Sequence, residues 1–454
     1  MDKQELRAAA ALACVFSVRM LGLFMVYPVF ASLTRGLPGA TPYTIGLALG
    51  IYGLTQGLLQ MPFGLLSDRV GRKMMIVIGL LVFGFGSAVA GSAHSIDGMI
   101  WGRALQGAGA VGSVILALVG DLTAEENRTK AMALVGMTIG LSFLVGFVAG
   151  PAIAGWIGIG GVFWLMSGLA LVGIAITLFV VPAPHRRRVH RESEAIPSLL
   201  GSTLSNGELL RLDFGIFALH AMLTASFLVV PRLLTGTLGM SAHAQWRVYL
   251  PLLLVSVAVM VPAIIAAERL RRMKTVLVTA VIALVASQGM LAAGGRDEWV
   301  LLLALTLFFA AFNVMEASLP SLVTKTAPPG STGTATGVYS SSQFLGIFVG
   351  GIAGGWVQQM AGTTAVFECS AALGALWFLA VATMRRPSYL TSRVVRVGAT
   401  GVAPEQLAMR LRQVPGVADA VVVMDDGVAY LKVDSKRFDE GRAEAVAAAS
   451  PDPV

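Results

Sequence analysis

Charged residues are scarce in this chain. Of its 454 residues, 13% are Asp, Glu, Lys or Arg, 56% are hydrophobic, and the mean hydropathy is +0.77. A soluble globular domain carries about twice this share of charge, so the composition excludes that class. The apolar residues gather in runs of about 20, the length that crosses a bilayer as a helix. We therefore expect a multi-span membrane protein.

Cysteine is rare as well, and its positions exclude two kinds of site. Cys14 and Cys369 fall inside apolar runs, in no spacing of a metal site or a disulfide framework.

The chain has no Gly-x-x-x-x-Gly-Lys-Ser/Thr motif of a nucleotide-driven pump. The net charge of +8 comes from basic residues dispersed among short loops, which argues against nucleic acid as a partner. We expect no metal, no cofactor and no enzymatic activity.

Spans of membrane length can be placed throughout the first 384 residues. Nineteen Lys and Arg lie on one side of these spans and three, Arg35, Arg247 and Arg296, on the other, which predicts that both termini are cytoplasmic. The twelve expected spans are 8–33, 43–66, 74–93, 98–119, 131–155, 160–182, 212–235, 246–268, 275–293, 299–323, 334–358 and 363–384.

The spans form two copies of one six-helix unit. Two sets of residues recur with an offset of 200, which predicts two bundles side by side with a site between them. We expect bundles at 1–182 and 212–384, joined by a cytoplasmic linker at 183–211. The repeated residues are Pro62, Asp68, Arg69 and Arg72 with Pro262, Glu268, Arg269 and Arg272, and Gly146, Gly150, Gly155 and Trp156 with Gly346, Gly350, Gly355 and Trp356.

The composition changes after Met384, where spans stop. A linker at 385–391 is expected to lead into a small α+β domain at 392–454. Its pattern predicts strands at 392–397, 418–424 and 428–433, with a hairpin turn at Asp425-Asp426-Gly427, and helices at 404–414 and 438–449. This βαββα order is ferredoxin-like without a last strand. A ligand, an ion or a dimer partner all remain open for this domain.

Three motifs resemble those of the major facilitator superfamily. Gly64-Leu-Leu-Ser-Asp-Arg-Val-Gly-Arg-Lys73 resembles its motif A, Arg103-x-x-Gln106-Gly107-x-Gly109 its motif B, and Gly146-x-x-x-Gly150-Pro151-x-x-x-Gly155 motif C of its proton-coupled antiporters. The tail is similar to the cytoplasmic YAM domain of one proton-driven, efflux-type subgroup. The resemblance implies a multi-pass protein of the bacterial inner membrane that acts on a small-molecule substrate, with protons and the lipid bilayer as its other partners.

Motif A contains the expected cytoplasmic gate. Asp68 and Arg72 are four residues apart and can pair on a helix, and Asp121 is the nearest acid to complete a network. The resemblance implies that this trio, with Gly64, Arg69 and Gly71, latches the two halves on the cytoplasmic side. A loop that only anchors the hairpin is the alternative. Glu268, Arg269 and Arg272 form the expected second-copy gate, in which Arg271 replaces the glycine.

Ionisable groups inside the spans are costly and are candidate functional residues. Glu316 is the expected proton carrier, with His220 and, by resemblance, Arg103 and Asp68 as further proton-coupling residues; a permanent ion pair that holds the bundle together is the alternative for Glu316. A central cavity is expected to hold Arg19, Gln56, Gln60, Asn313 and Gln343. Two buried arginines would suit an anion, but Glu316 could equally neutralise them.

Function follows from these elements as an expectation. We expect a proton-coupled secondary transporter, an efflux-type antiporter that exchanges a small amphipathic molecule for protons by alternating access. Motif C, with a kink at Gly150 and Pro151 in the first half alone, favours antiport. The alternatives are a facilitator or proton symporter of the same fold, or a transporter-like membrane sensor that signals through its C-terminal domain.

Overall fold

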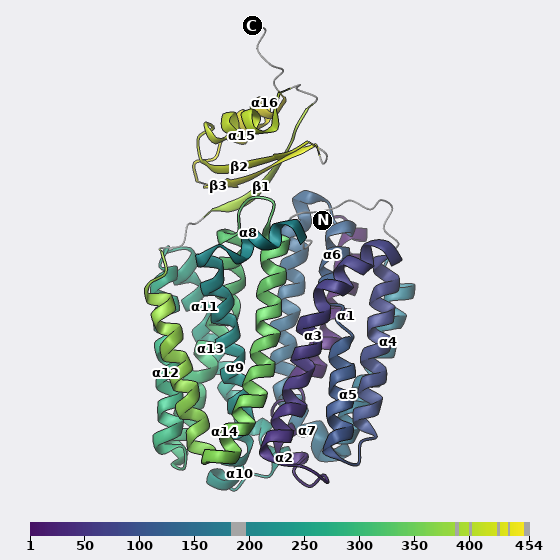
Figure 1. Cartoon of the computed structure of the whole chain (residues 1–454), viewed down its shortest axis with the longest axis vertical. Helices are drawn as coiled ribbons and strands as arrows, with labels where there is room; N and C mark the ends of the chain where they lie inside the picture. The colour runs from purple at the N-terminus through teal and green to yellow at the C-terminus, as the bar shows by residue number, and fades with distance from the viewer. Residues whose placement is uncertain (183–196, 386–389, 399–401, 425–426, 435, 449–454) are drawn as a thin grey trace.

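The computed structural model shows a long helical bundle with a small domain at one end (Figure 1). It describes residues 1–182, 197–385, 390–398, 402–424, 427–434 and 436–448, with backbone only for 125, 126, 128, 129 and 197. The linker residues 183–196 and 386–389 and the turn residues 425–426 lie outside this description. The N-terminus and the C-terminal domain lie at one end, called here the domain end, and α2 and α10 lie at the opposite, far end.

The N-terminal half is entirely helical within the described residues. Pro28 follows the first helix, whose expected span at 8–33 is divided into α1 and α2 because proline lacks an N–H and ends a helix. The expected span at 98–119 is also divided, since residues 109–111 leave the helical path next to Gly107 and Gly109. The elements are α1 (Lys3–Phe24), α2 (Phe30–Leu33), α3 (Pro42–Val70), α4 (Arg72–Gly91), α5 (Ile96–Ala108), α6 (Gly112–Leu122) and α7 (Glu125–Phe179).

The C-terminal half repeats this arrangement, and its first long helix begins at Gly207, ahead of the expected boundary at 212. α14 corresponds to α7: each is a pair of helices joined at one glycine with positive φ, Gly158 (φ 68°) in α7 and Gly362 (φ 89°) in α14. The elements are η1 (Pro197–Leu199), α8 (Leu200–Leu204), α9 (Gly207–Phe227), α10 (Val230–Leu238), η2 (Ala242–Ala244), α11 (Trp246–Glu268), α12 (Met273–Gly294), α13 (Glu298–Thr326) and α14 (Thr332–Ala382).

The bundle presents an apolar outer surface. Within the described residues, nine helical segments are long and apolar enough to cross a membrane, and α7 and α14 each count once among them although a glycine divides them. Large apolar side chains such as Phe179 (83% exposed) and Trp156 (88% exposed) lie on the outside. Such a surface is stable in lipid, so the fold is that of a multi-span membrane protein.

The C-terminal domain is a three-stranded antiparallel sheet in the order β1-β3-β2, accompanied by two helices. The helices contribute Leu407, Leu411, Ala443 and Ala447 to its small apolar core. The βαββα pattern predicted from the sequence is confirmed in order and type. Its elements are β1 (Thr391–Arg396), α15 (Pro404–Arg412), β2 (Val417–Val423), β3 (Val428–Val433) and α16 (Glu440–Ala448).

Two contacts fasten this domain to the C-terminal half. The buried Lys432 of β3 donates from Nζ to the Thr324 carbonyl at the end of α13 (2.6 Å) and to Ser392 Oγ of β1 (2.9 Å). Arg271, between α11 and α12, has its Nη2 3.5 Å from Asp434 Oδ1. The domain therefore contacts the loop that corresponds to motif A in the second copy.

Candidate transport site

The motif A residues form an ion-pair network at the domain end of the N-terminal half. Arg72 begins α4, and its Nε lies 2.5 Å from Asp121 Oδ2 of α6 while its Nη2 lies 3.4 Å from Asp68 Oδ1 of α3. The Asp121 side chain is 1% exposed and the Asp68 side chain 46%. Gly71 has φ 105°, which favours glycine at this sharp turn. The pairing expected among Asp68, Arg72 and Asp121 is present, whereas Arg69 is exposed.

We expect Arg72→Lys to destabilise the protein by about 1–3 kcal/mol, because one ammonium group cannot reach two carboxylates as the planar guanidinium does. Chemical unfolding of the purified protein in detergent measures this loss. Arg69→Lys, on the same turn but exposed, is the matched control. Equal stability of the two variants would contradict a role for the Arg72 network in holding α3, α4 and α6 together.

The second copy of motif A is built differently. Glu268 ends α11 and binds Lys325 Nζ of α13 (2.6 Å from Oε1 and 2.5 Å from Oε2), and Ser321 Oγ donates to its Oε1 (3.0 Å). Ser321 stands at the position that Asp121 has in the first copy. Arg269 and Arg272 are exposed, and Arg271 has φ 54°, an unfavourable value for a residue with a side chain. The two copies of motif A are therefore not equivalent.

A polar cluster lies in the core of the C-terminal half. Gln343 Nε2 of α14 donates to His220 Nε2 of α9 (2.8 Å) and to Glu316 Oε1 of α13 (3.3 Å). His220 Nδ1 lies 3.2 Å from the Ile216 carbonyl, so a neutral ring that donates from Nδ1 satisfies both contacts. Glu316 Oε2 is buried, has no hydrogen bond to the described residues, and is 3.8 Å from His220 Nε2. The structure thus brings Glu316, His220 and Gln343 together.

Two further polar residues lie on the same helices and were not predicted from the sequence. Asp213 of α9 is 6% exposed, and Tyr339 of α14 has a buried hydroxyl without a hydrogen-bond partner among the described residues. The Tyr339 hydroxyl is within electrostatic range of both Glu316 and Asp213. The signal was helical spacing, since Asp213 precedes His220 by seven residues and Tyr339 precedes Gln343 by four.

The core of the N-terminal half is basic. Arg103 of α5 is fully buried: it pairs with Gln106 Oε1, donates from Nε to the Ala48 carbonyl (3.4 Å) and from Nη2 to the Leu49 carbonyl (3.3 Å), and lies 4.7 Å from the Tyr52 ring centroid. Arg19 of α1 is fully buried too, and its Nη2 is 3.4 Å from the Tyr52 hydroxyl. The Arg103 guanidinium thus has hydrogen-bond partners on α5 and α3, whereas Arg19 makes one long hydrogen bond to the described residues.

The two halves meet closely at the far end and the midplane. Tyr27 of the first half shares a 3.0 Å hydrogen bond with Thr224 of the second. A Cβ added to Gly46 of α3 would lie 2.2 Å from the Gly351 carbonyl oxygen of α14, so the two helices are in backbone contact. An aromatic cluster from both halves fills the space between α1, α7, α9, α11 and α13. It comprises Tyr27, Phe143, Phe147, Phe227, Tyr249, Phe309 and Phe312.

Comparison with known proteins gives the family. The family model described as Major Facilitator Superfamily matches residues 12–351 and 212–415, and the model described as YajR YAM domain matches residues 395–445. The chain belongs to the major facilitator superfamily. It is 44% identical over 436 residues to the "Inner membrane transport protein YajR" of Escherichia coli K12, which covers 96% of each chain.

More distant members of the superfamily are also similar. The "Multidrug resistance protein MdtH" of Aeromonas hydrophila is 26% identical over 339 residues, which cover 74% of this chain and 82% of that one. The crystal structure of a bacterial homologue of the human lysosomal transporter Spinster, described as inward-facing and occupied, superimposes with a TM-score of 0.68 at 13% identity, over 84% of this chain and 96% of that one. The second likeness supports the superfamily fold alone.

The other residues expected in the central cavity and in motif C make contacts within and between helices. Asn313 donates to Ser256 Oγ of α11 (2.6 Å), and Gln56 Nε2 lies 3.5 Å from Gln60 Oε1 on α3. In motif C, Cβ atoms at Gly146 and Gly150 would lie 2.7 Å from Phe24 Cβ and 2.4 Å from the Met25 carbonyl oxygen. Pro151 lies inside α7. Gly155 faces the second half, where a Cβ would lie 2.3 Å from His243 Cβ.

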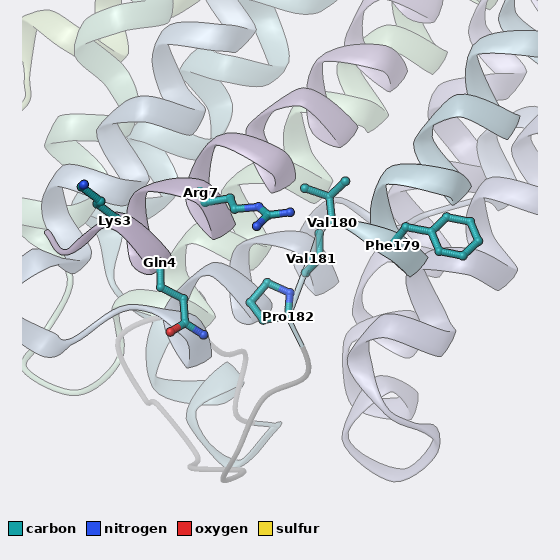
Figure 2. A pocket seen from close by; sticks show the side chains of 7 residues that line it. All are labelled: Lys3, Gln4, Arg7, Phe179, Val180, Val181 and Pro182. Carbon is teal, nitrogen blue, oxygen red and sulfur yellow. The ribbon is translucent and has the colours of Figure 1, made fainter.

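A surface recess at the domain end lies apart from these clusters (Figure 2). It is formed where the start of α1 meets the end of α7, and the Arg7 side chain points toward Val180 and Val181. None of the site residues expected from the sequence lines it. The recess is lined by Lys3, Gln4, Arg7, Phe179, Val180, Val181 and Pro182.

Proposed function

We propose that this superfamily member is a proton-coupled secondary transporter, an efflux-type antiporter that exchanges small amphipathic molecules for protons. The observation that carries the proposal is the Glu316 cluster, in which the Glu316 side chain is 28% exposed, its Oε2 is buried and the His220 side chain is 2% exposed. A carboxylate deep in a helical bundle, with one oxygen unpartnered and a neutral imidazole 3.8 Å away, is arranged to take up and release a proton. The likeness to a multidrug resistance protein supports efflux.

Alternating access supplies the mechanism. The two halves are in contact through the aromatic cluster and the α3–α14 glycines at the far end, while the motif A network lies at the domain end. We place the domain end, both termini and the C-terminal domain on the cytoplasmic side of the bacterial inner membrane, because most of the Lys and Arg residues in the loops lie at the domain end. Rocking of the halves would then open the far end and close the domain end around Asp68, Arg72 and Asp121.

The test uses the wild-type protein in proteoliposomes loaded with a pH-sensitive dye. Amphipathic cations, acids and neutral compounds are added singly across an imposed pH gradient. We expect at least one compound to drive proton movement that empty liposomes lack, with uptake of that compound against its gradient. Uptake that persists unchanged after an ionophore collapses the pH gradient would indicate a facilitator instead.

A sensor role for the C-terminal domain is the second candidate. The contacts of Lys432 with Thr324 and of Arg271 with Asp434 connect this domain to the end of α13 and to the loop between α11 and α12. A regulatory domain would modulate flux through them. If a chain ending at Met384 keeps its proton-coupled flux, transport is the primary function and the domain is at most a regulator.

A further inference from the structure

Arg19 is a buried cation whose charge no residue of the described structure balances. It lies five residues before the end of α1, is fully buried, and makes one hydrogen bond to the described residues, the 3.4 Å contact with the Tyr52 hydroxyl. Its Nε and Nη1 have no hydrogen-bond partner among the described residues. None of the ion pairs found among those residues includes Arg19. A guanidinium group stays protonated in proteins, so Arg19 cannot avoid this cost by losing its charge.

The acid that could have neutralised Arg19 is held elsewhere. Glu316 is bound by Gln343 in the C-terminal half, next to His220, and the acids of motif A bind Arg72. The second buried arginine, Arg103, uses carbonyl and amide oxygens instead of an acid. The first-half core therefore carries positive charge, and a buried charge without a partner costs several kcal/mol. Such a residue is best explained by a partner that arrives from outside the chain.

The surroundings of Arg19 are polar on the side of α3. A Cβ added to Gly112 of α6 would lie 3.3 Å from Arg19 Nη1 and 3.8 Å from Gln60 Oε1, so Arg19 and Gln60 both lie against this glycine. Gln56 Oε1 is also buried without a partner among the described residues. The amides of Gln56 and Gln60 make these surroundings unsuited to a hydrocarbon group.

We propose that Arg19, together with Tyr52, Gln56 and Gln60, binds an anionic group of the transported molecule. The chemical class is an organic anion whose carboxylate, phosphate or sulfonate oxygens accept hydrogen bonds from the two unpartnered guanidinium nitrogens. This inference rests on the proposed transport function and deepens it by naming the charge of the substrate. The apolar remainder of the molecule would extend toward the interface of the halves.

This subsite is connected to the Glu316 cluster. Tyr52 lies between the two arginines, and its ring contacts Phe344 of α14 (6.4 Å between centroids). Phe344 follows Gln343, which holds His220 and Glu316. The anion subsite at Arg19 and the protonation site at Glu316 thus lie on opposite sides of the α3–α14 contact. Anion binding at Arg19 would be coupled to protonation of Glu316, because this contact changes when the two halves rock.

The experiment compares wild-type protein with Arg19→Met in thermal unfolding of the full chain in detergent. The probes are benzoate, benzenesulfonate and phenyl phosphate, each paired with an uncharged analogue such as benzamide, with sodium sulfate as the inorganic arm. We expect an acid to raise the Tm of the wild type more than its uncharged analogue does, and its half-saturating concentration to rise about tenfold or more in Arg19→Met. Arg296→Met, an exposed arginine at the far end, is the control.

The Tm without ligand and the pattern of Tm shifts across the probes both test the anion site. Without ligand, Arg19→Met should have a Tm at or above that of the wild type, since an unbalanced buried charge is removed. A Tm lower by more than about 4 °C would show a structural role and overturn the proposal. So would equal shifts with acids and analogues, no shift with any acid, or a shift with sulfate alone. Acid binding through Arg19 without proton flux would preserve the anion site and refute proton coupling.

Discussion

Glu316→Gln is expected to reduce proton-driven transport to the level of empty liposomes while the protein still folds. Glutamine has the size and shape of glutamate, and its carbonyl oxygen can keep the hydrogen bond from Gln343 that Glu316 Oε1 accepts. It cannot bind or release a proton. The His220 ring, which already accepts from Gln343 at 2.8 Å, keeps its partner. The variant therefore removes the titrating group and little else.

Two measurements separate a proton carrier from a structural acid. In the first, accumulation of the substrate against its gradient is driven by an imposed pH difference, and Glu316→Gln should lose it. In the second, labelled and unlabelled substrate exchange without any gradient, and the variant should retain this exchange. Glu298→Gln, in the exposed first turn of the same helix, is the matched control. Loss of both activities together with a lower Tm would mean that Glu316 only holds α13 in place.

The sequence predicted those parts of the site that depend on local spacing. Asp68 and Arg72 are one helical turn apart, so their pairing needs no knowledge of the fold, and the repeat with an offset of 200 located the second gate. The strands of the C-terminal domain were equally clear, because alternation and a turn at Gly427 are local signals. The partner of Glu268 was not foreseen, since Lys325 lies on another helix and is brought near by packing of α11 against α13.

Helical spacing was not followed far enough at Asp213 and Tyr339. These residues lie seven positions before His220 and four before Gln343, so the spacing places each on the same helix face as a residue already expected at the site. Asn313 shows the reverse: it shares a helix with Glu316, yet it donates to Ser256 on α11. The glycines of α3 and α14 carried a usable signal, since small residues four apart on a membrane helix favour close approach. That they meet each other is a property of the tertiary structure.

Gly46→Leu is expected to prevent the two halves from closing at the far end. The Cβ alone would lie 2.2 Å from the Gly351 carbonyl oxygen and 3.0 Å from Gly355 Cα, and both of these atoms belong to the backbone of α14. Backbone atoms cannot turn aside as a flexible side chain does, so α3 and α14 must separate. Overpacking costs about 1–3 kcal/mol, which shifts a two-state equilibrium by about fivefold to 150-fold.

The shift can be measured as a distance between spin labels at Thr44 on α3 and Gln359 on α14, in a background where Cys14 and Cys369 are replaced by serine. Tyr43 N–H lies 3.3 Å from Gln359 Oε1, so these positions report on the far end directly. We expect a longer label separation in Gly46→Leu and slower substrate exchange, because one of the two states of the cycle is disfavoured. Gly168→Leu, in α7 with open space around its Cβ, should leave both unchanged. An unaltered separation in Gly46→Leu would mean that α3 and α14 do not need to touch when the far end closes.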